Sequence, residues 1–365
     1  MSGPGTSTST GAPPERTDSQ GATTRRTVDP DVTGADPSVA GDDWLVGHRG
    51  PAPRHLLSIA DLDRDGILEI MRLSDAFAEV AERPIPKVPA LRGRTVATVF
   101  MEPSTRTRLS FETAAKRLSA DVMTFTAATS ASVKGESLRD TVETLDAMGI
   151  DAMVIRHHAS GAPLMVTNWV GASVVNAGDG THEHPTQALL DCYTIREALT
   201  AQRDGEVPAD LRGLRIAIVG DIKHSRVARS NVLAFTALGA EVVLVAPPTL
   251  MPASLEGWPV IATGDLDSTL GELDVIYLLR IQSERLGEVL LPSLDEYHWR
   301  YGLTRARADA LKKDALVMHP GPMIRGVEIS PEVADMPASL VTRQVRNGVV
   351  VRMAVLFHLL GSGVI

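Results

Sequence analysis

The sequence predicts an α/β protein built from two doubly wound domains, each with a parallel sheet, that face a shared active-site cleft. Three observations support this fold class. The chain has 365 residues, which suits two domains of ordinary size. Short apolar runs alternate with helical patterns, as in parallel sheets that are covered on both faces. Arginines, histidines and glycines gather directly after these runs, where open α/β sheets bind their ligands.

The apolar runs are the expected strands, and they lie at residues 95–100, 122–125, 152–155, 174–176, 215–219, 242–246, 275–279 and 316–318. Between them, apolar residues recur with the spacing of an amphipathic helix, for example at Phe111, Ala114, Ala115 and Leu118. The charged segment REALTAQRDGEVPADLRG separates the two sets of strands. We therefore expect the domain boundary near residues 200–212.

Residues 1–44 differ in composition from the rest of the chain. They contain almost no large apolar side chain, so they cannot bury enough surface to offset the entropy lost on ordering. They lack the apolar middle of a secretory signal and are too acidic for an organelle transit peptide. We predict a disordered low-complexity tail, and a tether to a partner chain is the alternative.

Composition and charge narrow the classes of function. The apolar fraction is 44%, yet no apolar run approaches the ~18 residues of a membrane span. A net charge of -9 argues against a surface that binds nucleic acid, so an anion site would be a local pocket of positive charge. The single cysteine, Cys192, excludes an internal disulfide and a thiolate metal cluster. A reduced, cytoplasmic setting fits this usage.

Residues 104–107 follow the first strand and begin a helix. A helix start presents unpaired N–H groups and the positive end of the helix dipole, and Ser104 is the expected N-cap. Two threonine hydroxyls and the Arg106 guanidinium add donors, so this turn predicts a phosphate site. The alternative, a capped helix with an Arg108–Glu112 pair, leaves Arg106 unexplained. Since GxxxxGK(S/T) and GxGxxG patterns are missing, we expect a small phosphorylated molecule instead of a nucleotide.

The segment HEHPTQALLD places a proline at a helix start, with His184 just before the helix and Gln187 one turn on. A metal site at His182 and His184 would need a third ligand and an open position, so we predict no metal and no cofactor. A more economical role for His184 is to polarise a carbonyl oxygen together with Arg156 and Thr107. His157 and His158 are interpreted as ordinary polar residues beyond a strand.

Polar residues of the second half, Arg226, Arg280 and Gln282, also follow strands. Two guanidiniums and an amide suit a small dicarboxylate. The alternatives are a surface position for Arg226 and an ion pair of Arg280 with Glu284. The polar segment SASVKGESL is either a connecting loop or a mobile loop whose lysine, Lys134, moves to contact an anion.

From about residue 54 to its end, the chain resembles the catalytic subunit of aspartate carbamoyltransferase. The resemblance rests on the motifs STRTRLSFE, KGESL, VIRH, NAGDGTHEHPTQALLD, VGDIKHSRVARS, LLRIQSERL and MHPGP, which occur in that order. It implies transfer of the carbamoyl group of carbamoyl phosphate to L-aspartate, the committed step of pyrimidine biosynthesis. No protein nucleophile is implied, and the leaving phosphate is expected to take the amine proton.

The resemblance also implies residue roles. Residues that would bind the phosphate are Ser104, Thr105, Arg106 and Thr107. Residues that would hold the carbamoyl group are Arg156, His184 and Thr107 at the carbonyl oxygen, Gln187 at the amide, and Gly321 and Pro322 through backbone carbonyls. Residues that would bind aspartate are Arg226, Arg280, Gln282 and Lys134. Ser130 and Lys134 would extend into the active site of a neighbouring subunit. This sharing of residues between subunits implies a homotrimer.

The resemblance assigns a substrate to each domain. Residues 45–200 would bind carbamoyl phosphate, with a C-terminal helix at 343–365 completing this domain, and residues 201–342 would bind aspartate. Some relatives with N-terminal extensions assemble with dihydroorotase or a pseudo-dihydroorotase, so a regulatory chain or a dihydroorotase-like partner is a further expectation.

Two rival functions fit the sequence less well. Ornithine carbamoyltransferases share the STRTR and HPTQ elements, but typically carry HCLP and SMG motifs, whereas this chain has HPGP at residues 319–322. Cationic ornithine would also be repelled by Arg226 and Arg280. A non-catalytic scaffolding subunit would be expected to have a broken site, and the site positions here are intact.

Overall fold

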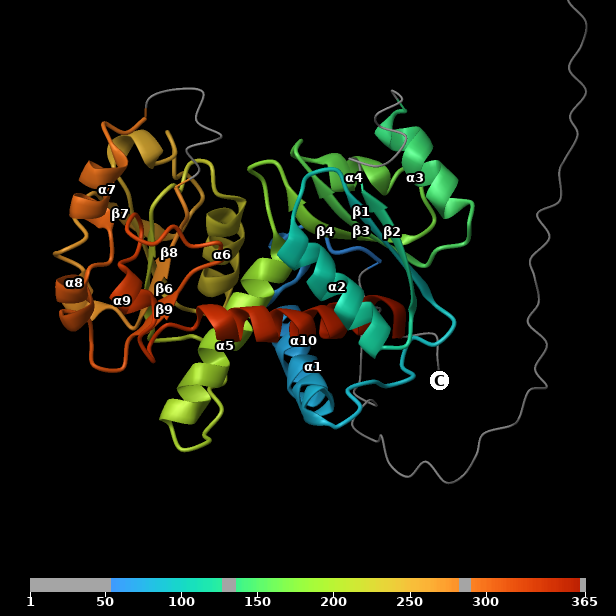
Figure 1. Ribbon diagram of the computed structural model, residues 1–365, viewed down its shortest axis with the longest axis horizontal. Coiled ribbons are helices and arrows are strands. Elements are labelled where there is room, and N and C mark those ends of the chain that lie inside the picture. The colour runs from blue at the N-terminus through green and yellow to red at the C-terminus, as the bar shows by residue number, and fades with distance from the viewer. Residues whose placement is uncertain (1–53, 127–135, 282–289, 362–365) are drawn as a thin grey trace, which may run out of the picture. The chain divides into compact units, whose positions relative to one another are not determined.

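The computed structural model describes residues 54–126, 136–281 and 290–361 (Figure 1). The predicted tail at residues 1–44 lies outside the described residues. The described chain contains two sheets in which every strand pair is parallel. This confirms the predicted fold class of two parallel-sheet α/β domains.

The first sheet has the strand order β2-β1-β3-β4, and the second has the order β7-β6-β5-β8-β9. The strands of the first sheet are β1 (Thr95–Phe100), β2 (Asp121–Thr126), β3 (Ala152–His157) and β4 (Ser173–Asp179). The strands of the second are β5 (Arg215–Val219), β6 (Glu241–Val245), β7 (Val260–Thr263), β8 (Val275–Leu278) and β9 (Leu316–Met318).

All the strands expected from apolar runs are present, with small shifts at their ends. The structure also contains strand β7, which the sequence analysis does not predict. Its four residues form the edge of the second sheet, and all of them are partly or fully exposed. A short, half-exposed edge strand lacks the continuous apolar run by which a strand buried on both faces is predicted from sequence.

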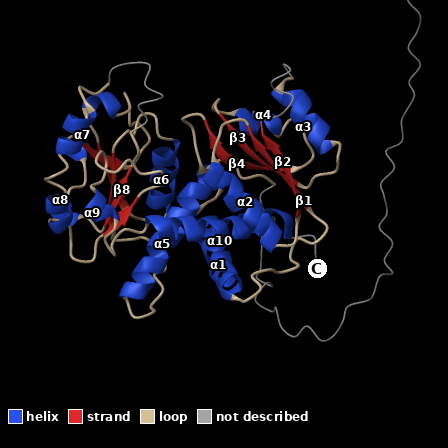
Figure 2. Ribbon diagram, in the orientation of Figure 1, coloured by secondary structure: helices blue, strands red, loops and turns tan. Residues whose placement is uncertain are grey.

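Helices flank both sheets (Figure 2). The α-helices are α1 (Arg64–Glu82), α2 (Thr105–Arg117), α3 (Leu138–Asp146), α4 (Ala162–Val166), α5 (Pro185–Gln202), α6 (Arg226–Ala237), α7 (Leu294–Tyr301), α8 (Arg305–Asp309), α9 (Pro331–Ala334) and α10 (Val341–Leu360). Short 3-10 helices are η2 (Ile59–Asp61), η5 (Pro248–Leu250) and η6 (Leu270–Glu272).

Helix α2 packs against β1 and β2 through the predicted apolar stripe. Phe111, Ala114, Ala115 and Leu118 are all buried, so the helical spacing inferred from the sequence is confirmed. This packing fixes the helix with its first turn just beyond the carboxyl end of β1, which positions residues 104–107.

Helices α5 and α10 each pack against several other elements of the fold. Helix α10 packs against α1, α2 and α5, and Figure 1 shows it in red beside them. Helix α5 packs against β4 and also against α6, which belongs to the second sheet. The proposed domain boundary near residues 200–212 covers the last residues of α5 and most of the connection to β5.

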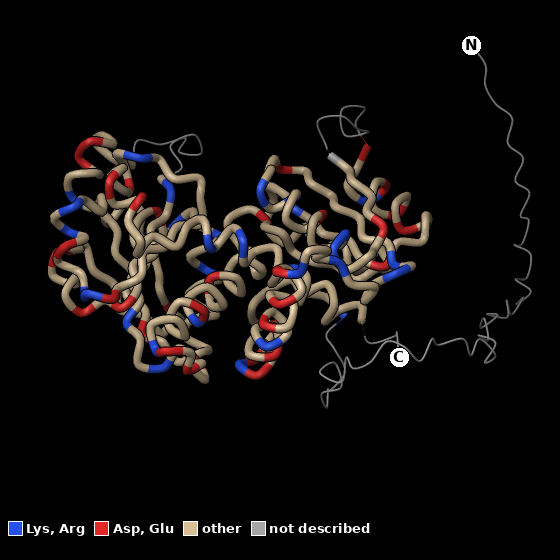
Figure 3. Tube along the Cα trace, turned by 60° about the horizontal axis from the view of Figure 1, so that its bottom comes forward, with Lys and Arg blue, Asp and Glu red and all other residues tan. Residues whose placement is uncertain are grey.

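Charged positions of both signs are interspersed along the described chain (Figure 3). None of the helices in the described residues is both long enough and apolar enough to span a bilayer.

Candidate active site

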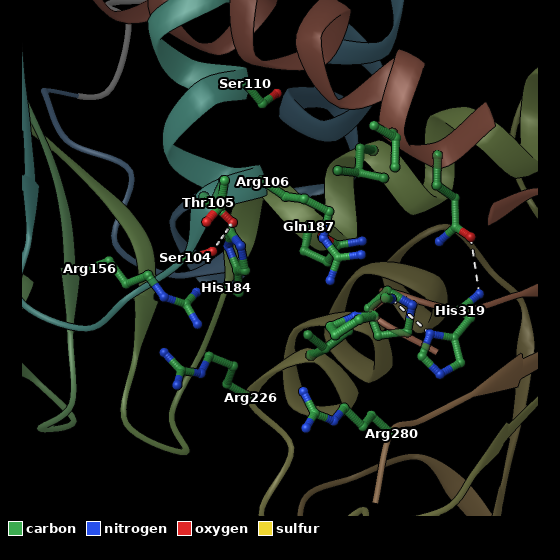
Figure 4. Close-up of a pocket in the computed structure, with 18 of the residues that line it drawn as sticks. Ser104, Thr105, Arg106, Ser110, Arg156, His184, Gln187, Arg226, Arg280 and His319 are labelled. Carbon is green, nitrogen blue, oxygen red and sulfur yellow. Dashed lines mark hydrogen bonds between the residues drawn. The ribbon is translucent and has the colours of Figure 1, made fainter. Parts of the chain in front are cut away.

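A cavity of about 610 Å³ lies where the carboxyl ends of strands from both sheets meet (Figure 4). This volume falls within the range of ~300–1,000 Å³ that small-molecule sites occupy. The predicted site residues that line it are Ser104, Thr105, Arg106, Thr107, Arg156, His184, Gln187, Arg226, Arg280, Gly321 and Pro322. The cleft expected from the polar strand ends is therefore present.

Three predicted site residues, Ser130, Lys134 and Gln282, lie outside the described residues. The same holds for Glu284, the alternative partner proposed for Arg280.

The start of α2 supplies donors to one wall of the cavity. Ser104 occupies the N-cap position as predicted, but its side chain makes no capping hydrogen bond. Its hydroxyl instead donates to Thr107 Oγ1 at 3.0 Å. The N–H groups of the first turn are therefore left without a side-chain cap, and they point toward the space that an anion would fill.

Arg106 and Arg108 leave the same helical turn with different partners. Arg108 Nη1 lies 3.5 Å from Glu112 Oε1, so the predicted ion pair at i, i+4 is confirmed. Within the described residues, no carboxylate pairs with Arg106. Desolvation by the cavity walls, and secondarily the nearby Arg280, lower the pKa of Arg106 from its ordinary value. An arginine held among other cations and lacking a carboxylate suits an anionic ligand.

Glu102, which the sequence analysis missed, joins the two sides of the cavity. Its carboxylate accepts from Arg156 Nη2 at 2.9 Å and from Arg226 Nη2 at 2.8 Å. Arg226 is only 5% exposed, so its alternative as a surface residue is wrong. Arg226 Nη1 is also buried and has no hydrogen-bond partner, which leaves it as a donor for a ligand.

Gly178 permits the close approach of these two arginines. A β-carbon at this position would stand 2.6 Å from Arg156 Nη1 and 3.0 Å from Arg226 Nη1. Its φ of +115° is also one that side chains rarely adopt. Gly178, the first glycine of the motif NAGDG, is thus explained by packing against two guanidiniums, a contact that only the tertiary structure reveals.

His184 is the N-cap of α5, and the proline that follows it occupies the helix start as predicted. Its Nδ1 is buried without a hydrogen-bond partner. Burial first, and then the neighbouring Arg156, Arg352 and Arg226, hold the pKa of His184 well below its ordinary value. The imidazole is therefore neutral, and one ring nitrogen can donate to a carbonyl oxygen.

Gln187 lies one turn into α5, with its amide at the cavity (Figure 4). Its Nε2 donates to Asp191 Oδ1 at 3.0 Å, which leaves Oε1 as the acceptor for a ligand. Asp191 is a second residue that the sequence analysis missed.

The other histidines near the strand ends have local partners. His157 and His158 stack on each other with ring centroids 4.2 Å apart, and neither lines the cavity. His182 Nδ1 lies 3.2 Å from the Asp179 carboxylate. Among the described residues, no group of three or more His, Cys, Asp or Glu side chains is arranged to hold a metal ion.

A cavity that joins an uncapped helix start to arginines of another sheet suits an enzyme that brings two anionic substrates together. Residues 54–197 match the family model described as aspartate/ornithine carbamoyltransferase, carbamoyl-P binding domain. Residues 212–359 match the model described as aspartate/ornithine carbamoyltransferase, Asp/Orn binding domain. The chain belongs to the aspartate/ornithine carbamoyltransferase family.

Within this family, the relatives most similar in sequence include aspartate carbamoyltransferases. The chain is 58% identical to the aspartate carbamoyltransferase catalytic subunit of Acidothermus cellulolyticus, over 85% of this chain and 93% of the relative. It is also 58% identical to the protein of the same name from Streptomyces coelicolor, over 85% of this chain and 95% of the relative.

Solved structures agree with these relatives. Aspartate transcarbamoylase from Trypanosoma cruzi in complex with carbamoyl phosphate and aspartate superimposes with a TM-score of 0.74 at 31% identity, over 84% of this chain and 97% of that chain. The catalytic subunit of M. jannaschii aspartate transcarbamoylase gives a TM-score of 0.70 at 36% identity, over 84% of this chain and 98% of that chain.

Proposed function

We propose that this chain transfers the carbamoyl group of carbamoyl phosphate to the amino group of L-aspartate, giving N-carbamoyl-L-aspartate and phosphate. This reaction is the committed step of de novo pyrimidine biosynthesis. The observation that carries the proposal is that the uncapped start of α2 shares one cavity with Arg226 at the start of α6 and Arg280 just after β8. One site for a phosphate and one for a dicarboxylate match the two substrates.

The phosphate of carbamoyl phosphate binds at the start of α2. The first-turn N–H groups, the hydroxyls of Ser104 and Thr105, and the Arg106 guanidinium donate to its oxygens. The helix dipole adds a favourable field of the same sign. These donors also stabilise the charge that remains on the phosphate when it leaves.

The carbonyl oxygen of the substrate binds between Thr107, Arg156 and His184. Thr107 Oγ1 accepts the Ser104 hydroxyl, so its own hydroxyl proton is available to the substrate. Neutral His184 and cationic Arg156 complete the set of donors. Together they stabilise the oxyanion that forms when the neutral amine of aspartate attacks the carbamoyl carbon.

The carbamoyl –NH₂ donates to Gln187 Oε1 and to backbone carbonyls of Gly321 and Pro322. Collapse of the tetrahedral intermediate breaks the bond between the carbamoyl carbon and the phosphate oxygen. The leaving phosphate takes the proton that the amine loses, so the protein needs no general base. Holding both substrates in one cavity supplies much of the rate.

Aspartate binds through its carboxylates to Arg226 and Arg280, with Gln282 and Lys134 as further contacts. The unpartnered Nη1 of Arg226 supports its assignment. Ser130 and Lys134 act on the site of a neighbouring subunit, in a homotrimer. Residues 45–200 with the C-terminal segment 343–365, of which residues 343–360 lie in α10, form the carbamoyl-phosphate domain, and residues 201–342 form the aspartate domain.

The proposed setting is the cytoplasm, and a regulatory chain or dihydroorotase-like partner is a further proposal. Sizing the protein with and without residues 1–44, alone and in cell extract, tests both the trimer and such a partner. A monomer at assay concentration would contradict the cross-subunit roles.

The activity is tested by supplying carbamoyl phosphate with aspartate or with ornithine in parallel reactions. We expect carbamoylation of aspartate and none of ornithine, because the two acceptor-site arginines repel a cationic side chain. Carbamoylation of ornithine alone, or of neither amine, would overturn the proposed function.

A further inference from the structure

Asp191 is a buried carboxylate behind the cavity that the proposed mechanism does not use. It is 0% exposed and does not line the cavity. Each of its oxygens accepts two hydrogen bonds from side chains. Oδ1 accepts from Gln187 Nε2 at 3.0 Å and from Gln344 Nε2 at 2.7 Å. Oδ2 accepts from Asn231 Nδ2 at 3.1 Å and from Tyr277 Oη at 2.7 Å.

The carboxylate determines how the Gln187 amide is turned. An ionised carboxylate only accepts hydrogen bonds, so the amide must present Nε2 to Asp191 and Oε1 to the cavity. Burial raises the pKa of Asp191 to about 6, so the group is still mainly ionised at neutral pH. Without this constraint, the Gln187 amide could turn over and present a donor to the ligand.

The same oxygen of Asp191 also orients a second amide. Gln344 must give Nε2 to Asp191, which leaves its Oε1 to accept from the backbone N–H of His319 at 3.0 Å. His319 Nδ1 in turn accepts from the backbone N–H of Gly321 at 2.7 Å. A continuous chain of hydrogen bonds therefore runs from Asp191 Oδ1 to the loop at residues 319–322.

One branch ends on the Gln187 amide and the other on the backbone N–H of Gly321, and both residues line the cavity. Gln187 Oε1 and the backbone carbonyls of residues 321–322 accept from the carbamoyl –NH₂ in the proposed function. We propose that Asp191 is a positioning residue that makes the site select a carbamoyl group over an acetyl group, by fixing these acceptors toward the –NH₂. This inference rests on the proposed function.

The selectivity is measurable with two stable ligands. Phosphonoacetamide and acetonylphosphonate share the phosphonate and the carbonyl, and they differ in carrying –NH₂ or –CH₃. Isothermal titration of the full-length chain gives the ratio of their affinities. The wild-type chain should bind the amide more tightly than the methyl ketone. If it binds neither ligand, the proposed function is contradicted. The role of Asp191 is tested separately, by comparing the affinity ratios of the variants with that of the wild type.

Asp191→Ala removes the acceptor and should lower the preference for the amide by about tenfold, while the methyl ketone binds nearly as before. Asp191→Asn should restore the preference. Its carbonyl oxygen can face the two glutamine amides, and its amide can face Tyr277 Oη and the Asn231 Oδ1, which has no partner in the structure. A role in folding alone would weaken both ligands equally.

Tyr277→Phe is the matched control, because it removes a hydrogen bond from the same carboxylate but on Oδ2, away from both glutamines. Its preference should equal that of wild type. Should Asp191→Ala fail to fold, Gln344→Leu tests the second branch with the carboxylate in place, and the expected loss is about threefold. Equal weakening of both ligands, or an unchanged preference in the variant that folds, overturns the proposal.

Discussion

The guanidinium of Arg106 lies directly against Gly321. A β-carbon at residue 321 would stand 2.1 Å from Arg106 Nη1 and 2.8 Å from Arg106 Cζ. Gly321 also has a φ of +64°, in the left-handed region that favours glycine. Arg106 lies in helix α2 and Gly321 lies in the loop after β9, so the absence of a side chain at residue 321 lets this loop pack directly against the guanidinium.

Gly321→Ala should therefore displace Arg106 and lower kcat/KM for carbamoyl phosphate by about 100-fold, the size of effect that follows from misplacing a substrate-binding group by ~1 Å. Gly326→Ala is the control, because Gly326 has a similar φ of +88° and open space around its α-carbon. Steady-state kinetics of both variants separate displacement of Arg106 from backbone strain. Equal losses in the two would contradict the contact-based explanation.

Arg106→Ala should nearly abolish turnover while the fold survives. The variant removes the cation that is proposed to bind the phosphate and to stabilise its departure, so we expect kcat/KM to fall by at least about 100-fold. Arg108→Ala on the same helical turn is the comparison, because Arg108 is paired with Glu112 and should change kcat/KM little. Turnover is followed by phosphate release and folding by circular dichroism. Near-normal turnover of Arg106→Ala would refute the phosphate assignment.

Glu102→Ala should destabilise the chain by about 3 kcal/mol, since it leaves the buried Arg226 and the partly buried Arg156 without their shared carboxylate. Urea unfolding measures this change. Glu143→Ala breaks an exposed pair with Arg139 and should leave the free energy of unfolding nearly unchanged. If Glu102→Ala proves as stable as Glu143→Ala, the carboxylate does not hold the two arginines together.

Stability should fall as the pH drops below about 6.5. Burial lowers the pKa of both His184 and His319, so the unfolded chain binds protons in this range that the folded chain does not. Asp191 acts in the opposite sense, because burial raises its pKa to about 6 and the folded chain binds its proton first. The two histidines outnumber it, so their effect should dominate.

Urea midpoints at pH 7.5, 6.5 and 5.5 test this dependence. His184→Asn removes one of the groups and should give a shallower decline, by as much as ~1.4 kcal/mol per pH unit for one proton. A midpoint that rises toward pH 5.5 would contradict the prediction that the two buried histidines dominate the pH dependence.

Local sequence was sufficient for the described strands other than β7, for the starts of α2 and α5, and for the family. An apolar run followed by a turn of hydroxyls and a guanidinium predicts a strand and a helix N-terminus because both depend on neighbouring residues. The predicted residues at the strand ends line one cavity because the carboxyl ends of parallel strands meet at one edge of a sheet. Strand β7 was missed because an exposed edge carries little of this pattern.

Tertiary structure alone decided which side chains hold the site in place. Asp191 belongs to the motif HPTQALLD, yet its partners Tyr277 and Gln344 lie far along the chain. Glu102 is bound by Arg156 of β3 and Arg226 of α6, and Gly321 is required by a contact with Arg106. Periodicity and capping act over a few residues, whereas these contacts exist only after distant segments have packed, so no local pattern records them.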